Sequence, residues 1–146
     1  RLGRALATTG ELDQQSIDDS LAALRRFKAI ADGLGVESLR AIATCAVREA
    51  TNRGEFCQLV QEVIGQPVEV ISAEKEAHLA FHSVRRRFDL VGKNTLLADI
   101  GGGSTEIVLA SGEHIGAIYG TCLGAVRLSE KFGGGQSLAG DDFHRM

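Results

Sequence analysis

The chain has 146 residues, a formal net charge of −3 and 44% hydrophobic residues, which together predict one soluble globular domain. No apolar run approaches the roughly 18 residues that cross a bilayer, and no signal peptide opens the sequence, so we expect a cytoplasmic protein with no membrane partner. The acidic balance argues against a protein that holds nucleic acid by bulk charge. The cysteines, Cys45, Cys57 and Cys122, lie far apart without metal-ligand spacing, and we interpret them as buried thiols.

Helices and strands are expected to alternate in the first part of the chain. Three amphipathic helices follow the capping candidates Asp13, Asn52 and Ser72, and their apolar faces run from Ile17 to Leu34, from Phe56 to Ile64 and from Ala77 to Phe88. Asn52 and Glu55 form a capping-box-like start for the second helix. Between the helices, Ser38–Ala43 and Val68–Ile71 read as short buried strands. This order predicts an α/β layer with right-handed crossovers.

The rhythm changes after the third helix. Thr95–Ile100, Thr105–Ala110 and Ile115–Tyr119 are expected to be consecutive strands of a hairpin meander, and Leu123–Phe132 a further helix. The chain therefore mixes crossover units with antiparallel strands. No repeat or linker suggests a domain boundary.

The segment Ala98–Glu106, with the sequence ADIGGGSTE, carries the strongest chemical signal. It lacks the lysine of a P-loop, and a glutamate stands where a dinucleotide-binding fingerprint has its last glycine. A two-residue type I′ turn at Gly102 and Gly103 would place Asp99 directly opposite Glu106. Two carboxylates so paired repel each other, and a cation would relieve that.

We therefore predict Mg²⁺ at Asp99 and Glu106, since Mg²⁺ binds one or two carboxylates and bridges to phosphate. The predicted phosphate-binding residues are Gly101, Gly102, Gly103, Ser104 and Thr105, because backbone without Cβ atoms lets phosphate approach its N–H groups. The alternative is a glycine-rich hairpin whose carboxylates merely face water.

Four blocks of this sequence resemble the Ppx/GppA phosphatase family, which comprises exopolyphosphatases and guanosine pentaphosphate phosphohydrolases within the actin-like ATPase superfamily. The blocks are Ala43–Asn52 (ATCAVREATN), Val68–Ala77 (VEVISAEKEA), Asp99–Glu106 (DIGGGSTE) and Leu123–Leu128 (LGAVRL). The resemblance covers nearly the whole chain, and it implies a ribonuclease H-like fold with a mixed sheet, crossover helices and a phosphate-binding glycine hairpin.

The resemblance also implies an activity, the hydrolysis of a terminal phosphoanhydride of inorganic polyphosphate, of guanosine pentaphosphate, or of both. Glu76 would be the general base that activates water, and Arg48 would help to neutralise the transferring phosphoryl group. Asp99 and Glu106 would hold magnesium. Such a division of roles suits phosphoryl transfer, which needs positioning and charge stabilisation more than covalent chemistry.

The chain departs from the family pattern around Glu76. Ala73, Lys75 and His78 stand where the family has Gly, Glu and Arg. A second hypothesis is therefore a non-catalytic phosphate or nucleotide sensor, and a third is a kinase of the same superfamily. Without the resemblance, Glu76 would read as a solvated residue of a first helical turn, and His78 and His82 as surface or partly buried histidines rather than zinc ligands.

The family resemblance also implies that residues 1–146 are part of the family's N-terminal region. The first phosphate-loop strand and the C-terminal helical domain are absent from this sequence, so we expect the isolated fragment to be inactive. A homodimer is expected by analogy only.

Overall fold

The structure is a computed structural model that describes residues 2–132. The chain divides into two compact units, an N-terminal unit that ends at Ser72 and a C-terminal unit that begins at Ala73. The sequence carries no linker-like signal at this division. Each unit has its own hydrophobic core.

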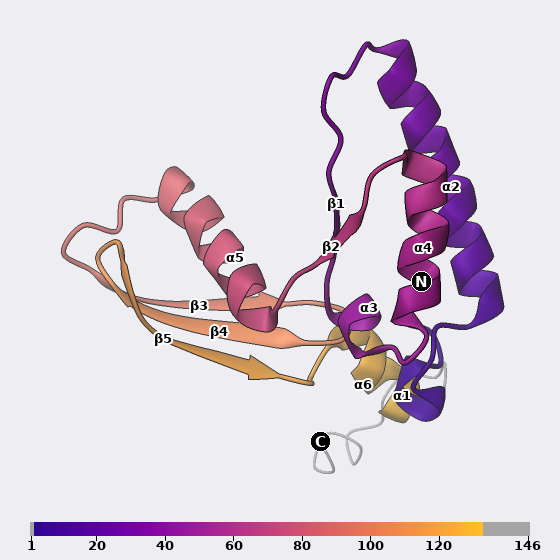
Figure 1. The fold of residues 1–146 in the computed structure, drawn as a ribbon. Coiled ribbons are helices and arrows are strands. Elements are labelled where there is room, and N and C mark those ends of the chain that lie inside the picture. The colour runs from indigo at the N-terminus through magenta and orange to yellow at the C-terminus, as the bar shows by residue number, and fades with distance from the viewer. Residues whose placement is uncertain (1, 133–146) are drawn as a thin grey trace. The chain divides into compact units, whose positions relative to one another are not determined.

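The N-terminal unit combines helices with a short parallel sheet (Figure 1). Its elements are α1 (Leu6–Thr9), α2 (Gln14–Gly33), β1 (Ala41–Ala43), α3 (Cys45–Glu49), α4 (Arg53–Ile64) and β2 (Val68–Val70). Helices α2 and α4 lie side by side, and β1 pairs with β2 in parallel, which is the crossover expected from the sequence.

Helix α2 begins where the sequence predicts. The carboxylate of Asp13 accepts a hydrogen bond from the Ser16 N–H at 3.0 Å, so the side chain caps one of the first N–H groups. Ile17 is buried, but Phe27 and Leu34, which we expected on the same apolar face, are 63% and 76% exposed. The apolar pattern therefore extends beyond the part of the helix that this unit covers.

The start of α4 differs from the expected capping box. The side-chain amide of Asn52 makes no cap; it bonds instead to the backbone of Leu12, accepting from its N–H at 3.0 Å and donating to its carbonyl at 2.9 Å. Asn52 thus ties the start of α4 to the segment before α2. Helix α3 was not expected, and it lies inside the ATCAVREATN block.

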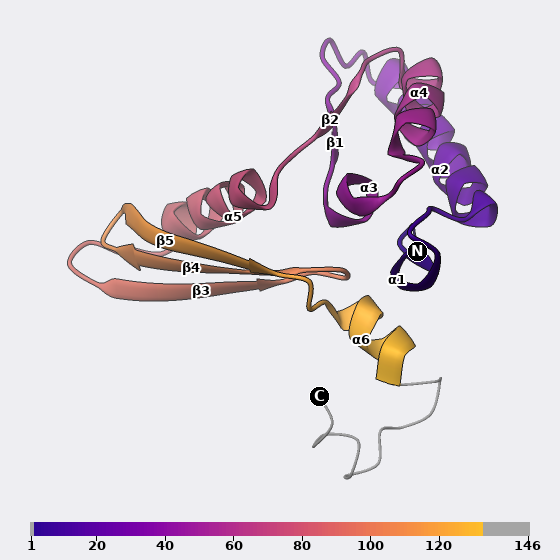
Figure 2. The ribbon, with the colours of Figure 1, turned by 60° about the horizontal axis from the view of Figure 1, so that its bottom comes forward.

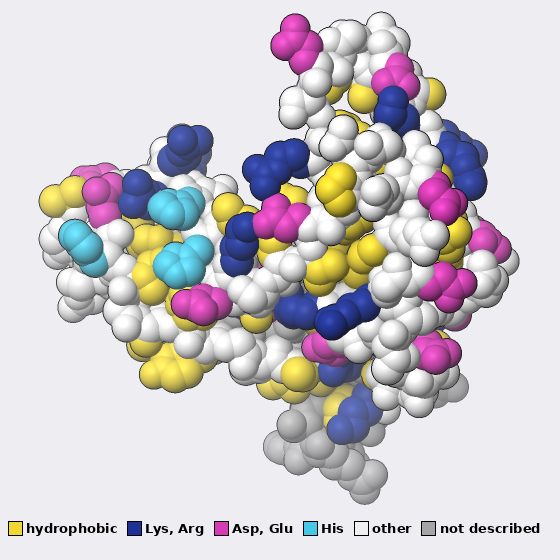
Figure 3. Space-filling view, viewed as in Figure 1, with side chains coloured by type: hydrophobic (Ala, Val, Ile, Leu, Met, Phe, Trp, Pro, Cys, Tyr) yellow, Lys and Arg dark blue, Asp and Glu magenta, His cyan; other side chains and the backbone are white. Residues whose placement is uncertain are grey.

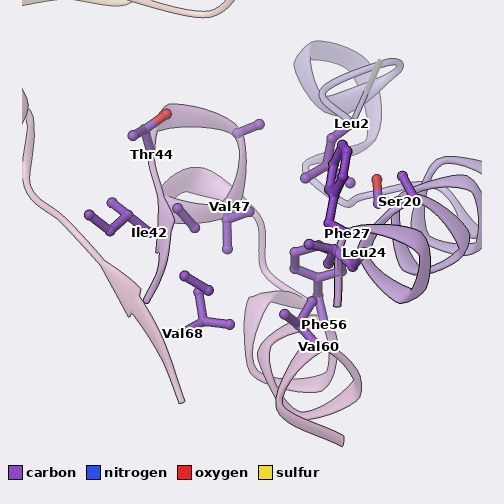
Figure 4. A pocket seen from close by; sticks show the side chains of 14 residues that line it. Leu2, Ser20, Leu24, Phe27, Ile42, Thr44, Val47, Phe56, Val60 and Val68 are labelled. Carbon is purple, nitrogen blue, oxygen red and sulfur yellow. The ribbon is translucent and has the colours of Figure 1, made fainter. Parts of the chain in front are cut away.

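An apolar cavity of about 460 Å³ lies in the N-terminal unit between α2, α4 and the parallel strands (Figure 4). Phe27, Ile42, Val47 and Phe56 contribute to its wall, and none of its lining residues is charged. Such a wall offers nothing to a polyanion, so this cavity is not the predicted phosphate site.

The C-terminal unit is a helix packed on an antiparallel meander, followed by a second helix (Figures 1 and 2). Its elements are α5 (Ala73–Arg87), β3 (Asn94–Ile100), β4 (Thr105–Ser111), β5 (His114–Thr121) and α6 (Ala125–Phe132). The strands are ordered β3-β4-β5, as the meander predicted.

Helix α5 covers one face of this sheet (Figure 2). Ala77 and Phe81 are fully buried in a core with Val108 and Ala110, which alternate with more exposed residues along β4. Phe88, which we expected in the same face, is 62% exposed beyond the end of the helix.

The α/β class is confirmed, with the strands divided between one parallel pair and one antiparallel sheet. Of the cysteines, Cys45 is buried, Cys57 is half-buried and Cys122 is exposed, so the interpretation as buried thiols is wrong for Cys122. Within residues 2–132, no helix is both long and apolar enough to span a bilayer.

Candidate functional site

The register of the β3–β4 hairpin is the one that the glycine turn predicted. Asp99 pairs with Glu106 and Ile100 with Thr105, and the Gly101 N–H donates to the Ser104 carbonyl at 2.9 Å. The turn is not type I′, however, because the described residues with positive φ do not include Gly102 or Gly103. The carbonyls of this loop are oriented by contacts with α6, which sequence reasoning did not anticipate.

Asp99 and Glu106 share one face of the sheet but differ in exposure. Glu106 is only 2% exposed, and its Oε1 atom has no hydrogen-bond partner among the described residues. Asp99 stands on the edge strand β3 and is exposed. A buried carboxylate oxygen without a partner is costly, so this position calls for a cation or a donor that a ligand supplies.

This pair fits a magnesium ion. Mg²⁺ takes one or two protein carboxylates and completes its shell with water and phosphate oxygens. Within the described part of the chain, no cluster of three or more His, Cys, Asp or Glu side chains forms a fuller cage. The donor set is therefore two hard oxygen ligands on adjacent strands, one buried and one open to solvent.

The residues Gly101–Ser104, which we call the glycine loop, join these two strands. On one side the loop is held by α6, because the Gly101 carbonyl accepts from the Ala125 N–H at 2.9 Å and the Gly102 carbonyl from those of Val126 and Arg127 at 2.9 and 3.1 Å. The N–H groups of Gly102 and Gly103 have no acceptor among the described residues. They are the backbone donors that the loop can offer to an anion.

The two hydroxyls predicted beside phosphate are placed differently. Thr105 Oγ1 donates to the Leu123 carbonyl at 2.6 Å, so its proton is used to hold the segment between β5 and α6. Ser104 is 6% exposed at the base of the loop. Of these two hydroxyls, the one on Ser104 is the better candidate donor to phosphate.

Glu76 lies in the first turn of α5, within the same unit. A Cβ built on Gly120 would lie 3.6 Å from Ala73 Cβ, which sets the start of α5 above the strand residue that pairs with Glu106. Glu76 is half-buried on the flank of the sheet-facing residues. The structure thus brings the start of α5, the paired carboxylates and the glycine loop to the same end of the sheet.

Arg48 belongs to the N-terminal unit, in contrast to the other predicted site residues. It is half-buried in α3, and its Nη1 donates to the Ile71 carbonyl just after β2, at 2.9 Å. This bond uses one of the five N–H donors of the guanidinium.

The described histidines all lie in the C-terminal unit, and Figure 3 shows histidine side chains gathered on its surface. His78 and His82 are one helical turn apart on α5 and are exposed. Their exposure agrees with their interpretation as surface histidines.

Gly124 is a site residue to which sequence reasoning assigned no role. It is buried, and a Cβ at this position would lie 2.4 Å from both the carbonyl carbon and the oxygen of Gly102. Gly124 belongs to the LGAVRL block, which resembles the family, but only its contact with Gly102 shows why a glycine is needed there.

Comparison with solved structures finds several exopolyphosphatases and Ppx/GppA family members that are similar to this chain. An exopolyphosphatase from Cytophaga hutchinsonii is 30% identical with a TM-score of 0.85, over 90% of this chain and 42% of that one. The Ppx/GppA family member of Aquifex aeolicus is 34% identical with a TM-score of 0.72, again over 90% and 42%. The type II variant of the Aquifex aeolicus Ppx/GppA phosphatase is 32% identical with a TM-score of 0.69, over 99% of this chain and 48% of that one.

The chain therefore spans less than half the length of these relatives. The sequence profile of the Ppx/GppA phosphatase family matches residues 1–145, which is almost the entire chain. By this match and by the similarity to solved family members, the chain belongs to the Ppx/GppA phosphatase family and has its actin-like ATPase fold.

Proposed function

We propose that this chain is part of a hydrolase that removes the terminal phosphate of inorganic polyphosphate, guanosine pentaphosphate, or both, by magnesium-assisted attack of water. The observation that carries the proposal is the buried, unpartnered Oε1 of Glu106 opposite Asp99, next to a loop with two outward backbone donors. A cation site beside an anion site is what a magnesium-bound phosphate chain requires.

The residues divide the work as follows. Asp99 and Glu106 hold the magnesium ion, which when bound neutralises charge on the phosphate oxygens. The Gly102 and Gly103 N–H groups and the Ser104 hydroxyl bind the terminal phosphate. As the family resemblance implies, Arg48 is the residue that we propose to neutralise charge on the transferring phosphoryl group, and within its own unit its bond to the Ile71 carbonyl restricts the guanidinium.

Glu76 acts as the general base. Its carboxylate accepts a proton from water as the water oxygen bonds to the terminal phosphorus and the bond to the bridging oxygen breaks. The products are orthophosphate and a substrate shortened by one phosphate. The half-buried position of Glu76 at the start of α5, at the end of the sheet where Asp99 pairs with Glu106, supports this role.

The test is phosphate release by the full-length protein, with long polyphosphate and guanosine pentaphosphate supplied separately, with and without Mg²⁺. We expect release to need Mg²⁺ and Glu76→Gln to lower kcat by about 10²–10⁴-fold, the usual contribution of general base catalysis, while substrate still binds. Glu74→Gln is the matched control, because Glu74 is an exposed acid of the same helical turn.

Two results would contradict parts of the proposal. Equal phosphate release by the Glu76→Gln and Glu74→Gln variants would remove Glu76 from the mechanism. Binding of both substrates with no release by the unaltered protein would favour the sensor, in which the altered block from Ser72 to His78 binds ligand without hydrolysing it.

A further inference from the structure

The N–H groups of the first turn of α6 donate hydrogen bonds to the glycine loop instead of facing solvent. The first N–H groups of a helix have no partner within the helix. In α6, those of Ala125, Val126 and Arg127 donate to the carbonyls of Gly101 and Gly102, at 2.9 to 3.1 Å. These helical donors are therefore satisfied by the loop, and they hold it from one side.

Gly124 makes this approach possible. A Cβ at Gly124 would lie 2.4 Å from the Gly102 carbonyl carbon and oxygen and 2.5 Å from the carbonyl carbon of Gly103, all backbone atoms that cannot swing away. The φ of Gly124 lies outside the left-handed range, so the residue is needed for contact and not for its conformational freedom. Any other residue would push α6 away from the loop.

The hydrogen bonds from α6 also fix the direction in which the N–H groups of the glycine loop point. In a trans peptide the C=O and the following N–H point in opposite directions, and the described residues contain no cis peptide. Because the Gly101 and Gly102 carbonyls point at α6, the N–H groups of Gly102 and Gly103 point away from it, toward a common side. Successive N–H groups with a common direction form an anion-binding concavity.

The dipoles of these peptides add to that of the helix. Each loop peptide accepts from a helical N–H and presents its own N–H outward, so it extends the hydrogen-bonded chain by one member. Hydrogen bonds in such chains polarise one another. The partial positive charge at the N-terminus of α6 is thereby extended through the loop peptides to the Gly102 and Gly103 N–H groups.

We propose that the first turn of α6 orients the glycine loop for phosphate, with Gly124 as the positioning residue that permits the contact. This inference rests on the proposed function, because it assumes that the loop binds a phosphate group. It assigns to α6 a role in affinity for the anion without any direct contact with the anion.

The experiment follows inorganic phosphate binding to the full-length ¹⁵N-labelled protein through the amide resonances of Gly102 and Gly103. Ala125→Pro removes the N–H that donates to the Gly101 carbonyl, at the first position of α6, where a helix tolerates proline. Gln14→Pro, at the first position of α2, is its control. Gly124→Ala is paired with Gly116→Ala, whose Cβ would lie an ordinary 3.6 Å from the Leu109 carbonyl.

We expect Ala125→Pro and Gly124→Ala to weaken phosphate binding about tenfold or more, because charge-assisted hydrogen bonds depend on alignment. Their Mg²⁺ affinity should be unchanged, since Asp99 and Glu106 are held by the sheet. A merely structural role would lower both affinities together. If Gly124→Ala does not fold, Ala125→Pro carries the test.

The outcomes separate the two proposals. If the unaltered protein shows shifts at Gly102 and Gly103 but both α6 variants bind phosphate as tightly as it does, the role of α6 is overturned and the proposed function stands. If phosphate moves neither amide resonance in the unaltered protein, the phosphate-binding role of the loop fails, and with it this inference.

Discussion

Replacing the buried Glu106 by glutamine changes charge but hardly changes shape, so it isolates the metal site. Without a cation, the buried Oε1 has no partner in the described region and the carboxylate faces Asp99 on the neighbouring strand. Glutamine removes one of the two like charges and offers an N–H₂ donor to Asp99. We therefore expect Glu106→Gln to stabilise the metal-free protein.

The size of this effect follows from the pairing. Residues directly opposite each other have Cβ atoms about 5 Å apart. At an effective dielectric constant of about 20, two unit charges at about that separation repel by about 3 kcal/mol. Water screens part of the repulsion at the exposed Asp99. The expected gain without Mg²⁺ is about 1–3 kcal/mol.

Magnesium should narrow or reverse this difference in stability. A ligand at about 100 times its Kd stabilises the folded protein by about 2.7 kcal/mol. The full-length protein should gain this with Mg²⁺, and the Glu106→Gln variant should gain nothing. The assay is the melting temperature with and without Mg²⁺, with Glu113→Gln in the exposed β4–β5 turn as the control.

Two outcomes would refute this reasoning. An undiminished magnesium shift in Glu106→Gln would show that the ion binds elsewhere. A metal-free Glu106→Gln variant that melts well below the unaltered protein would show that the Glu106 carboxylate stabilises the fold without a cation, against what its unpartnered oxygen implies.

Two further predictions concern the N-terminal unit. Asn52→Ala leaves the buried Leu12 backbone without its two hydrogen-bond partners and should destabilise the unit by about 1–3 kcal/mol, seen as faster amide exchange in α2 and α4; unchanged exchange would contradict it. The Ser16 side-chain and backbone hydrogen bonds hold the pKa of Asp13 below its ordinary value of 3.8. The stabilisation by Asp13 should therefore be complete above that value and be lost as the pH falls through the lowered pKa, and Asp13→Ala should remove this part of the acid dependence of α2 unfolding; an unaltered dependence would exclude the cap as its source.

The local parts of the fold were predictable because their causes lie within a few residues. Asp13 caps α2 through a residue three positions away, and the short glycine loop fixes the Asp99–Glu106 register. Asn52 shows the limit of such reasoning. Its spacing to Glu55 suggests a local cap, but the side chain finds a backbone partner 40 residues away at Leu12.

The apolar pattern predicted which face of a helix is hydrophobic but not how much of it is covered. Phe27, Leu34 and Phe88 continue their apolar faces and are nevertheless well exposed in their units. Periodicity reports the direction of a side chain, whereas burial needs a neighbour, and the neighbour is a tertiary fact.

The glycines of the site show most clearly that the structural role of a residue cannot always be predicted from the sequence. Glycine in a hairpin was interpreted as a need for positive φ, and Gly112 in the β4–β5 turn does have it, at 58°. Gly102 and Gly124 lie outside that range and instead touch each other across the β5–α6 connection. Both kinds of glycine look identical in a sequence. Only the packing distinguishes a residue that bends the chain from one that lets a helix orient a phosphate loop.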